Sequence, residues 1–320
     1  MRRVSQGCQA TGCMLTGPRE TSPSMKLLSD FDGVWTLPRE EGRAHGQALD
    51  TALEAQVGEG ERVEVREWVA RARAAVRAQP VRYGWVSAGR ISAFGDEDPF
   101  TEHGALLHYI HEQRAHDPLA ARLAGAIEAD GSTLDAFGGR CHVAGVQSVE
   151  ARRGPGITPE AAGAGRTLLA RGVDVVVVSN SGTEKLARWF QHASVPARVH
   201  PDHAPHELRL RGSARKFVLA PGAGEGLTVG SMRVDIARPD YERVLREERP
   251  DAVVGDVFSL DLALPLAFKR RDPAWRHVRL FWLVHPYTPE RMKRELASLA
   301  DGEVEPVEGG LAGVAQRLQG

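Results

Sequence analysis

The feature that most constrains the fold of this 320-residue chain is a series of short apolar runs that alternate with helical segments from Gly172 onward. The predicted strand Val173 to Val178 contains four consecutive valines, as expected for a strand buried on both faces of a sheet. Ala252 to Gly255 and Arg279 to Val284 repeat this pattern. Such alternation is typical of α/β proteins, so we predict a Rossmann-like parallel sheet flanked by helices. The expected later elements are helices over 183–191, 260–268 and 288–299, a short strand near Val304 and a helix from Leu311.

Residues 41–164 follow a different pattern, in which helical periodicity dominates and no parallel-strand alternation occurs. We interpret this segment as a large, mostly helical cap inserted after the first strand, with residues 25–40 and 165–320 forming the α/β core. Glycines, including Gly138-Gly139, interrupt the periodicity. Trp68, Trp85 and Phe94 either line the substrate side of the cap or, the interpretation we favour, form its core. Helices are predicted over 43–57, 61–79, 101–116 and 119–129.

A third irregular segment, residues 207–236, contains four short strand-like runs. Gly230-Ser231 is a good two-residue hairpin turn, so a small antiparallel flap is expected. The four runs are 208–210, 217–219, 227–229 and 232–236.

Composition argues against several classes of protein. The 41 Lys and Arg residues and 42 Asp and Glu residues give a net charge of −1, so no global field attracts nucleic acid. The longest apolar runs have the length of strands, so no membrane-spanning helix is expected. Three cysteines are too few for a disulfide framework, which favours a reducing cytoplasm. Residues 1–24 lack the apolar stretch of a signal peptide and are interpreted as a disordered extension. Nothing in the sequence indicates an oligomeric state.

The first apolar strand ends in the sequence Asp30-Phe-Asp32-Gly33. Residues i and i+2 of a strand share one face, so both carboxylates emerge together at the edge where ligands bind in α/β sheets. Two like charges this close repel each other unless a cation or a proton lies between them. We infer a Mg²⁺ site, with one carboxylate free to attack and its neighbour free to move protons. A solvated turn is the alternative for this motif taken alone.

Two later strands also end in polar residues. Ser179 and Asn180 follow the valine run, where a hydroxyl and the free N–H groups of a helix can hold a phosphate oxygen. A plain helix N-cap is the alternative. Gly255-Asp256 ends another strand, and Asp261 follows five residues later. Asp256 fits an oxygen-rich magnesium site shared with Asp30, whereas Asp261 is expected behind the direct ligands or as an ordinary helix-start acid.

Together and in this order, these motifs resemble those of the haloacid dehalogenase superfamily of phosphotransferases. The resemblance covers the core but not the inserted helices. It implies that Asp30 is a nucleophile that forms an aspartyl-phosphate, and that Asp32 protonates the leaving group and then deprotonates water. It also implies a Mg²⁺ ion bound by the Asp30 and Asp256 carboxylates and the Asp32 backbone carbonyl. The dehalogenase branch lacks an acid at the position of Asp32, so a phosphate ester is the better substrate.

The resemblance further implies a cation that contacts both the nucleophile and the phosphate. Lys216 is the first candidate and Arg238 the second, because the family often has Lys-Pro where this chain has Arg238-Pro. Lys185 is expected to lie too far along its helix to point inward. The predicted function is a magnesium-dependent phosphatase of a small soluble phosphorylated metabolite, without nucleic-acid or membrane partners. A phosphomutase or phosphotransferase, and a non-catalytic binding or regulatory protein, are the alternatives on the same fold.

Overall fold

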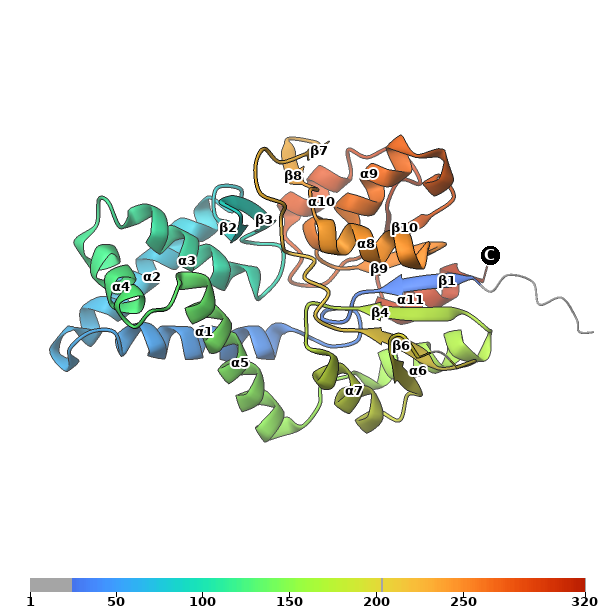
Figure 1. Cartoon of the computed structure of the whole chain (residues 1–320), viewed down its shortest axis with the longest axis horizontal. Coiled ribbons are helices and arrows are strands. Elements are labelled where there is room, and N and C mark those ends of the chain that lie inside the picture. The colour runs from blue at the N-terminus through green and yellow to red at the C-terminus, as the bar shows by residue number, and fades with distance from the viewer. Residues whose placement is uncertain (1–24, 203, 320) are drawn as a thin grey trace, which may run out of the picture.

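The computed structural model of the chain describes residues 25–202 and 204–319. The predicted N-terminal extension, residues 1–24, lies outside the described residues. The polypeptide forms two lobes that lie side by side, an α/β core and a mainly helical cap (Figure 1). The cap is inserted between the first strand of the core and the second core strand along the chain. No helix in the part of the chain that the structure describes is long and apolar enough to cross a bilayer.

Seven parallel strands form the central sheet, which confirms the predicted α/β, Rossmann-like fold. In the register of the sheet, Ser29 lies opposite both Val177 and Val254, so three central strands end at the same level. This alignment places the residues that follow those strands at one edge of the sheet. In spatial order the strands are β11 (Glu305–Val307), β10 (Arg279–Leu283), β9 (Ala252–Gly255), β1 (Lys26–Ser29), β4 (Asp174–Val178), β6 (Leu208–Arg211) and β5 (Ala197–Val199).

Helices cover both faces of the sheet (Figure 1). Successive side chains of β4 point to opposite faces, so Val176 and Val178 pack in one hydrophobic core and Val175 and Val177 in the other. Burying each valine fully contributes roughly 1.5–3 kcal/mol. One face carries α8 (Pro239–Glu248), α9 (Ala263–Arg271) and α10 (Glu290–Leu296), and the other α6 (Pro159–Ala170), α7 (Thr183–His192) and α11 (Gly310–Arg317). A π-helical turn, η2 (Phe258–Leu262), precedes α9, and a 3₁₀ turn, η3 (Pro273–Trp275), follows it.

The cap has a hydrophobic core of its own, built mainly by its helices. The four helices predicted from periodicity are present, with ends shifted by up to four residues. The cap also contains an antiparallel hairpin, which the sequence patterns did not predict. The predicted division at residues 40/41 and 164/165 stays a prediction; in the structure α6 packs on the sheet of the core. The cap elements are α1 (Arg39–Glu54), η1 (Glu59–Glu61), α2 (Arg62–Ala78), β2 (Gly84–Ser87), β3 (Arg90–Phe94), α3 (Thr101–Gln113), α4 (Pro118–Ala129) and α5 (Leu134–Arg153).

Helix α5 runs unbroken through Gly138-Gly139, which we had interpreted as an interruption. The glycines of α5 allow close packing. A Cβ atom at Gly145 would lie 2.5 Å from the backbone nitrogen of His45, and one at Gly138 would lie 2.4 Å from Cδ1 of Leu107. The contact at Gly145 is with backbone atoms, so glycine is needed where α5 crosses α1, whereas a larger residue at Gly138 would require the Leu107 side chain to move. Periodicity alone cannot distinguish such a packing glycine from a helix breaker.

The predicted flap is smaller than expected. Strands β7 (Gly226–Val229) and β8 (Met232–Asp235) form the antiparallel hairpin, but residues 217–219 are not a strand. Residues 208–210 belong to β6 of the main sheet instead. The arginines of β6 made this run look like a solvent-exposed strand. In the structure Arg209 pairs with Asp174 and Glu248, both at 2.8 Å, and these ion pairs cover the polar side of the strand.

Buried hydrogen bonds fix the cap hairpin to the core. The Arg238 guanidinium donates to the backbone oxygens of Ser92 and Lys216, both at 2.6 Å. The Glu97 carboxylate accepts from the backbone nitrogens of Phe94 in the cap and Ser259 in the core, both at 2.9 Å. Glu97 therefore bridges the two lobes without a cationic partner among these contacts.

We expect the buried Glu97 carboxylate to make stability fall as pH rises. Burial raises the pKa of Glu97 from 4.5 to about 7, although its hydrogen bonds from Ser259 and Phe94 oppose the shift. The folded state therefore holds this proton between pH 4.5 and 7 while the unfolded chain has released it. Relative to Glu97→Gln, the wild type should lose about 2 to 3 kcal/mol of unfolding free energy across this interval and change little above it.

Urea unfolding of both proteins at pH 5, 6, 7 and 8 measures this difference, with Glu160→Gln on the exposed face of α6 as the control. The Glu97→Gln variant loses one accepting oxygen. This loss changes its free energy of unfolding by the same amount at every pH and adds no pH dependence. Parallel pH profiles for wild type and Glu97→Gln would contradict the expected titration.

Candidate active site

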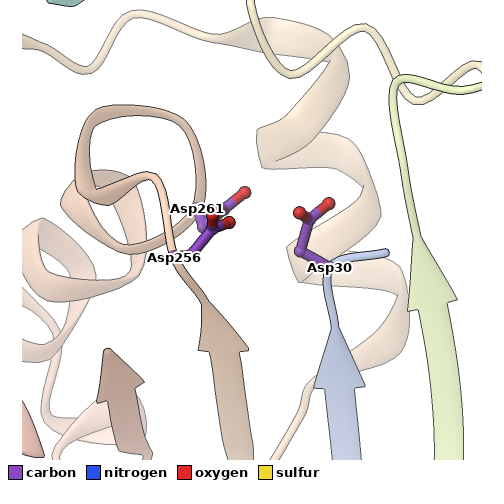
Figure 2. Close-up of side chains that lie close together, drawn as sticks. All are labelled: Asp30, Asp256 and Asp261. Atoms are coloured by element: carbon purple, nitrogen blue, oxygen red, sulfur yellow. The ribbon is translucent and has the colours of Figure 1, made fainter. Parts of the chain in front are cut away.

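Three carboxylates meet at the C-terminal ends of β1 and β9 (Figure 2). Asp30 directly follows β1, Asp256 directly follows β9, and Asp261 lies in the π-helical turn η2. One oxygen of each carboxylate lies within 4.8 Å of the others. The parallel register produces this meeting: the Asp30 backbone nitrogen donates to the Val254 carbonyl at 2.9 Å, which holds the two strand ends level.

Lys216 lies between two of these carboxylates. Its Nζ donates to Asp30 Oδ1 at 2.5 Å and to Asp261 Oδ1 at 2.6 Å, and the residue is only 2% exposed. Its backbone nitrogen donates to Asn180 Oδ1 at 2.7 Å, which ties the Lys216 loop to the end of β4. Lys216 is therefore the predicted cation that contacts Asp30.

Arg238, the second candidate for the cation beside Asp30, does not contact Asp30. It is fully buried and does not line the cavity above Asp30. Its guanidinium donates to the Lys216 carbonyl and to Ser92, so it supports the backbone of the cationic residue instead of approaching the nucleophile. The expectation of a phosphate contact from Arg238 is thus corrected by its position.

The charges in this cluster do not balance. Burial and the neighbouring Asp261 raise the pKa of Asp30 to about 8, although Lys216 opposes the shift. Burial and Asp30 raise the pKa of Asp256 well above its usual value. Burial alone would lower the pKa of Lys216, but Asp261 and Asp30 outweigh it and raise that pKa. Three carboxylates around one ammonium favour a further cation or bound protons.

Asp32 is held apart from the cluster although it lies only two residues from Asp30. Its Oδ2 accepts from Ser181 Oγ at 2.9 Å, and its Oδ1 lies 3.6 Å from Lys185 Nζ. Lys185 also contacts Glu41 of α1 at 2.8 Å. The expectation that Lys185 points away was wrong: α7 begins at Thr183, as predicted, but the ammonium of Lys185 in its first turn reaches Asp32 and Glu41.

The Ser179 side chain points into the protein. Ser179 is completely buried, its Oγ accepts from the Ser181 backbone nitrogen at 3.0 Å, and it does not line the cavity. Asn180 and Ser181 do line the cavity. The phosphate-binding role of Ser179 and Asn180 therefore stays a prediction, and Ser181, which the sequence reasoning did not select, holds Asp32.

No family model matches the chain, and no curated protein matches it significantly. Similar solved structures include a 2-haloacid dehalogenase from Pseudomonas syringae (15% identity, TM-score 0.38, 92% of this chain and 98% of that one). A putative haloacid dehalogenase-like hydrolase from Bacillus subtilis bound to magnesium has 11% identity and a TM-score of 0.35, covering 86% and 99%. Cytosolic 5′-nucleotidase IIIB bound to cytidine has 10% identity and a TM-score of 0.33, covering 92% and 87%.

At such TM-scores the fold assignment depends on the molecule's own features. These are the parallel strand order, the Asp30-x-Asp32 motif at the end of the central strand, and the Lys216 and Gly255-Asp256 elements that converge on it. They have the arrangement that the sequence motifs predicted. The chain has a Rossmann-like α/β fold, and its site motifs resemble those of the haloacid dehalogenase superfamily.

The carboxylate cluster fits the magnesium ion that the sequence motifs imply. Asp256 Oδ1 is buried and has no hydrogen-bond partner within the described residues, while Oδ2 accepts from the Tyr287 hydroxyl at 2.9 Å. A Cβ atom at Gly33 would lie 2.1 Å from Asp256 Oδ2, so glycine leaves the carboxylate its space. Buried, negatively charged oxygen ligands suit Mg²⁺. Asp261 is less available as a magnesium ligand, because its two oxygens already accept hydrogen bonds from Lys216 and from the Val257 backbone nitrogen.

We expect Mg²⁺ affinity to rise with pH. The raised pKa of Asp30, about 8, means that a proton competes with the ion below that pH. If one proton is released, affinity should increase about tenfold per pH unit between pH 6 and 8 and level off above. Calorimetric titration with MgCl₂ at pH 6, 7 and 8, in buffers of different ionisation enthalpy, measures affinity and released protons together. Affinity that is independent of pH, with no proton released, would contradict this coupling; Asp256→Asn is the non-binding control.

A cavity of about 630 Å³ lies above the cluster, between core and cap. The core contributes Asp30, Asp32 and Lys216 to it. The cap contributes aromatic and polar side chains, of which the sequence motifs indicated only Trp85 as a possible wall residue, because the tertiary fold alone brings the others to this place. Trp85 lines the cavity, contrary to the core position we favoured, whereas Trp68 and Phe94 are buried in hydrophobic cores as expected. The main cap residues of the wall are His45 (α1), Trp85 (β2), Phe100 and His142 (α5).

Proposed function

We propose that this chain is a magnesium-dependent phosphomonoester hydrolase that acts on a small phosphorylated metabolite through an aspartyl-phosphate. The observation that carries the proposal is the division of labour between two neighbouring carboxylates. Asp30 contacts Lys216 inside the buried cluster, whereas Asp32 is held outside it by Ser181. This difference supports a role as nucleophile for Asp30 and as proton carrier for Asp32.

Each residue has one role in the reaction. An Asp30 oxygen attacks phosphorus and the bond to the leaving oxygen breaks, while Asp32 gives its proton to that oxygen. Asp32 then takes a proton from a water molecule, whose oxygen attacks the phosphoryl group and restores the Asp30 carboxylate. Lys216, already bonded to Asp30, offsets negative charge on the transferring group. The magnesium ion would be held by Asp30, Asp256 and the Asp32 carbonyl, and would neutralise phosphoryl oxygens.

The cap encloses the carboxylate cluster in a cavity, which supports hydrolysis of a small substrate. It covers the cluster on the side away from the sheet, and the cavity of about 630 Å³ has the size of a small-molecule site. A haloacid would need a cation for its carboxylate, yet Lys216 is the single Lys or Arg among the described residues that line the cavity, and two aspartates already bind it. This arrangement favours a phosphate ester over a haloacid.

Asp32→Asn should separate the two chemical steps. With an alkyl phosphate, whose leaving alkoxide needs a proton, kcat should fall by about 10²- to 10⁴-fold. With p-nitrophenyl phosphate the leaving group needs no proton, so one equivalent of p-nitrophenolate should appear in a burst. Turnover should then nearly stop, because no base activates water. Stopped-flow absorbance records the burst and phosphate release records the alkyl substrate.

The broader test is a panel of phosphorylated metabolites with Mg²⁺, comparing wild type with Asp32→Asn. Release of phosphate from one compound class by the wild type, and its loss in the variant, is the expected result. Wild-type protein that releases no phosphate from any member of the panel or from p-nitrophenyl phosphate would overturn the proposal.

A further inference from the structure

An apolar patch lines the cavity beside the carboxylate cluster. It consists of Trp85 from the hairpin β2–β3, which lies where the cap meets the core (Figure 1), and of Phe217, Val257 and Leu260 from the core. Val257 and Leu260 are buried, and the two aromatic side chains pack against them while remaining partly exposed. The apolar patch therefore combines a buried base with two rings that a ligand in the cavity can contact.

The chain order places the apolar patch next to the reacting groups. Each of its three core residues is the direct chain neighbour of a residue in the charged cluster; the pairs are Lys216-Phe217, Asp256-Val257 and Leu260-Asp261. Consecutive Cα atoms lie about 3.8 Å apart. The alcohol portion of an ester whose phosphate is held by the cluster is therefore within reach of the apolar patch.

The two rings of the apolar patch are held in fixed positions. Trp85 and Phe217 stack on each other across the boundary between cap and core, with their centroids 4.6 Å apart and an interplanar angle of 13°. Trp85 also packs closely on α3, because a Cβ atom at Gly104 would lie 3.2 Å from the Trp85 Cα atom. A surface that is ordered before binding costs a ligand little conformational entropy.

Polar side chains near the apolar patch support the loop that carries Phe217. Ser92 Oγ donates to the Phe217 carbonyl at 2.6 Å, and Ser87 Oγ accepts from the Leu219 backbone nitrogen at 2.9 Å. Asn180 Oδ1 accepts from the backbone nitrogen of the residue before Phe217 at 2.7 Å. Ser87 and Asn180 line the cavity, but these oxygens are already engaged. A hydroxyl group lying on the apolar patch would therefore find few replacements for its hydrogen bonds to water.

From this geometry we infer that the apolar patch binds the alcohol portion of the phosphomonoester, and that this portion is an apolar group instead of a polyol. The inference rests on the proposed hydrolase function and adds the substrate class. Covering the apolar patch removes apolar surface of both partners from water, which stabilises the complex in proportion to the area covered. A polyol would bury hydroxyl groups against the same surface, and that desolvation is unfavourable.

A series of alkyl phosphates tests the preference for apolar groups. Ethyl, butyl and hexyl phosphate release alcohols of nearly equal acidity, so differences in kcat/KM report binding of the alkyl chain. The value should rise about two- to fourfold with each added methylene and make hexyl phosphate at least about tenfold better than ethyl phosphate. Sorbitol 6-phosphate, which has the same number of carbons as hexyl phosphate, should have a kcat/KM at least about tenfold below it.

Trp85→Ala and Phe217→Ala test whether the apolar patch is the surface responsible. Each variant should reduce the ratio of kcat/KM for hexyl phosphate to that for ethyl phosphate at least about threefold, because part of the contact surface is removed. This ratio is independent of how much of the protein is folded, so general damage to the fold does not change it. Phe217→Leu, which keeps an apolar side chain, should recover most of the ratio. Val63→Ala, at an exposed position of α2 outside the cavity, is the control and should keep the wild-type ratio.

Three outcomes would overturn the inference and leave the hydrolase proposal intact. These are a hexyl-to-ethyl ratio below about tenfold in the wild type, hydrolysis of sorbitol 6-phosphate as efficient as that of hexyl phosphate, and an unchanged ratio in both alanine variants. Hydrolysis of p-nitrophenyl phosphate without hydrolysis of any alkyl phosphate would also overturn it. Protein that hydrolyses neither the alkyl phosphates nor p-nitrophenyl phosphate would overturn the proposed function and this inference with it.

Discussion

Asp30→Asn is expected to lower kcat by at least about 10⁴-fold on every substrate, because an amide oxygen cannot form the acyl-phosphate. The folded state should not suffer. Asp30 is one of three buried carboxylates near a single lysine, and burial raises its pKa to about 8, so without a metal ion it binds a proton at neutral pH. Asparagine is neutral as well, and Lys216 keeps Asp261 as its partner. The melting temperature should therefore stay the same or rise.

Phosphate release and thermal unfolding of the same preparations measure both effects. Asp272→Asn, which changes a capping acid on the opposite side of α9 from the site, is the matched control and should keep wild-type activity. An Asp30→Asn protein with more than about 1% of wild-type kcat would show that another residue is the nucleophile.

Lys216→Met is expected to damage activity and stability together. The ammonium that bridges Asp30 and Asp261 at 2.5 and 2.6 Å disappears, and two buried carboxylates lose their shared donor. Breaking a buried ion pair by removing one partner costs about 3–5 kcal/mol. The loss of positive charge beside the transferring phosphate should lower kcat by about 10²- to 10³-fold. Urea unfolding and steady-state kinetics measure the two effects.

A double variant tests the physical cause of this instability. Adding Asp30→Asn to Lys216→Met removes one of the two unpaired carboxylates, so the double variant should be more stable than Lys216→Met alone. Lys269→Met is the control, because Lys269 donates to the carbonyls of Val278 and Gly302 outside the cavity. Additive losses in the double variant would contradict the charge argument.

Much of the core could be predicted from sequence because its signals are local. The valines of β4 and the apolar residues of β9 and β10 mark strands buried on both faces, whatever the rest of the chain does. The path of β6 could not be predicted in this way. Its arginines look exposed until Asp174 and Glu248, remote in sequence, are placed beside them. Likewise, the glycines of α5 have meaning only once α1 is packed against them.

The residues of the site also divide into those with a local sequence signal and those that only the tertiary fold identifies. Asp30 and Asp256 could be selected because each directly follows a recognisable strand, and Lys216 because the family resemblance calls for a cation that contacts the nucleophile. Lys185 was misjudged although the start of α7 was predicted, because only the tertiary fold brings Asp32 and Glu41 beside its side chain. Tyr287 carries no local signal, since it belongs to a loop after β10 and contacts Asp256 only in three dimensions.

The central claim is that Asp30 itself carries the phosphoryl group during turnover. The most direct measurement is the mass of the peptide containing Asp30, after Asp32→Asn protein is mixed with p-nitrophenyl phosphate and Mg²⁺ and quenched in acid within the burst. Because Asp32 is not available to activate water, the intermediate should accumulate. One phosphoryl group per protein molecule, located on Asp30 by fragmentation, is the expected result. A burst of product with no phosphoryl group on the protein, or with the group on another residue, would contradict it.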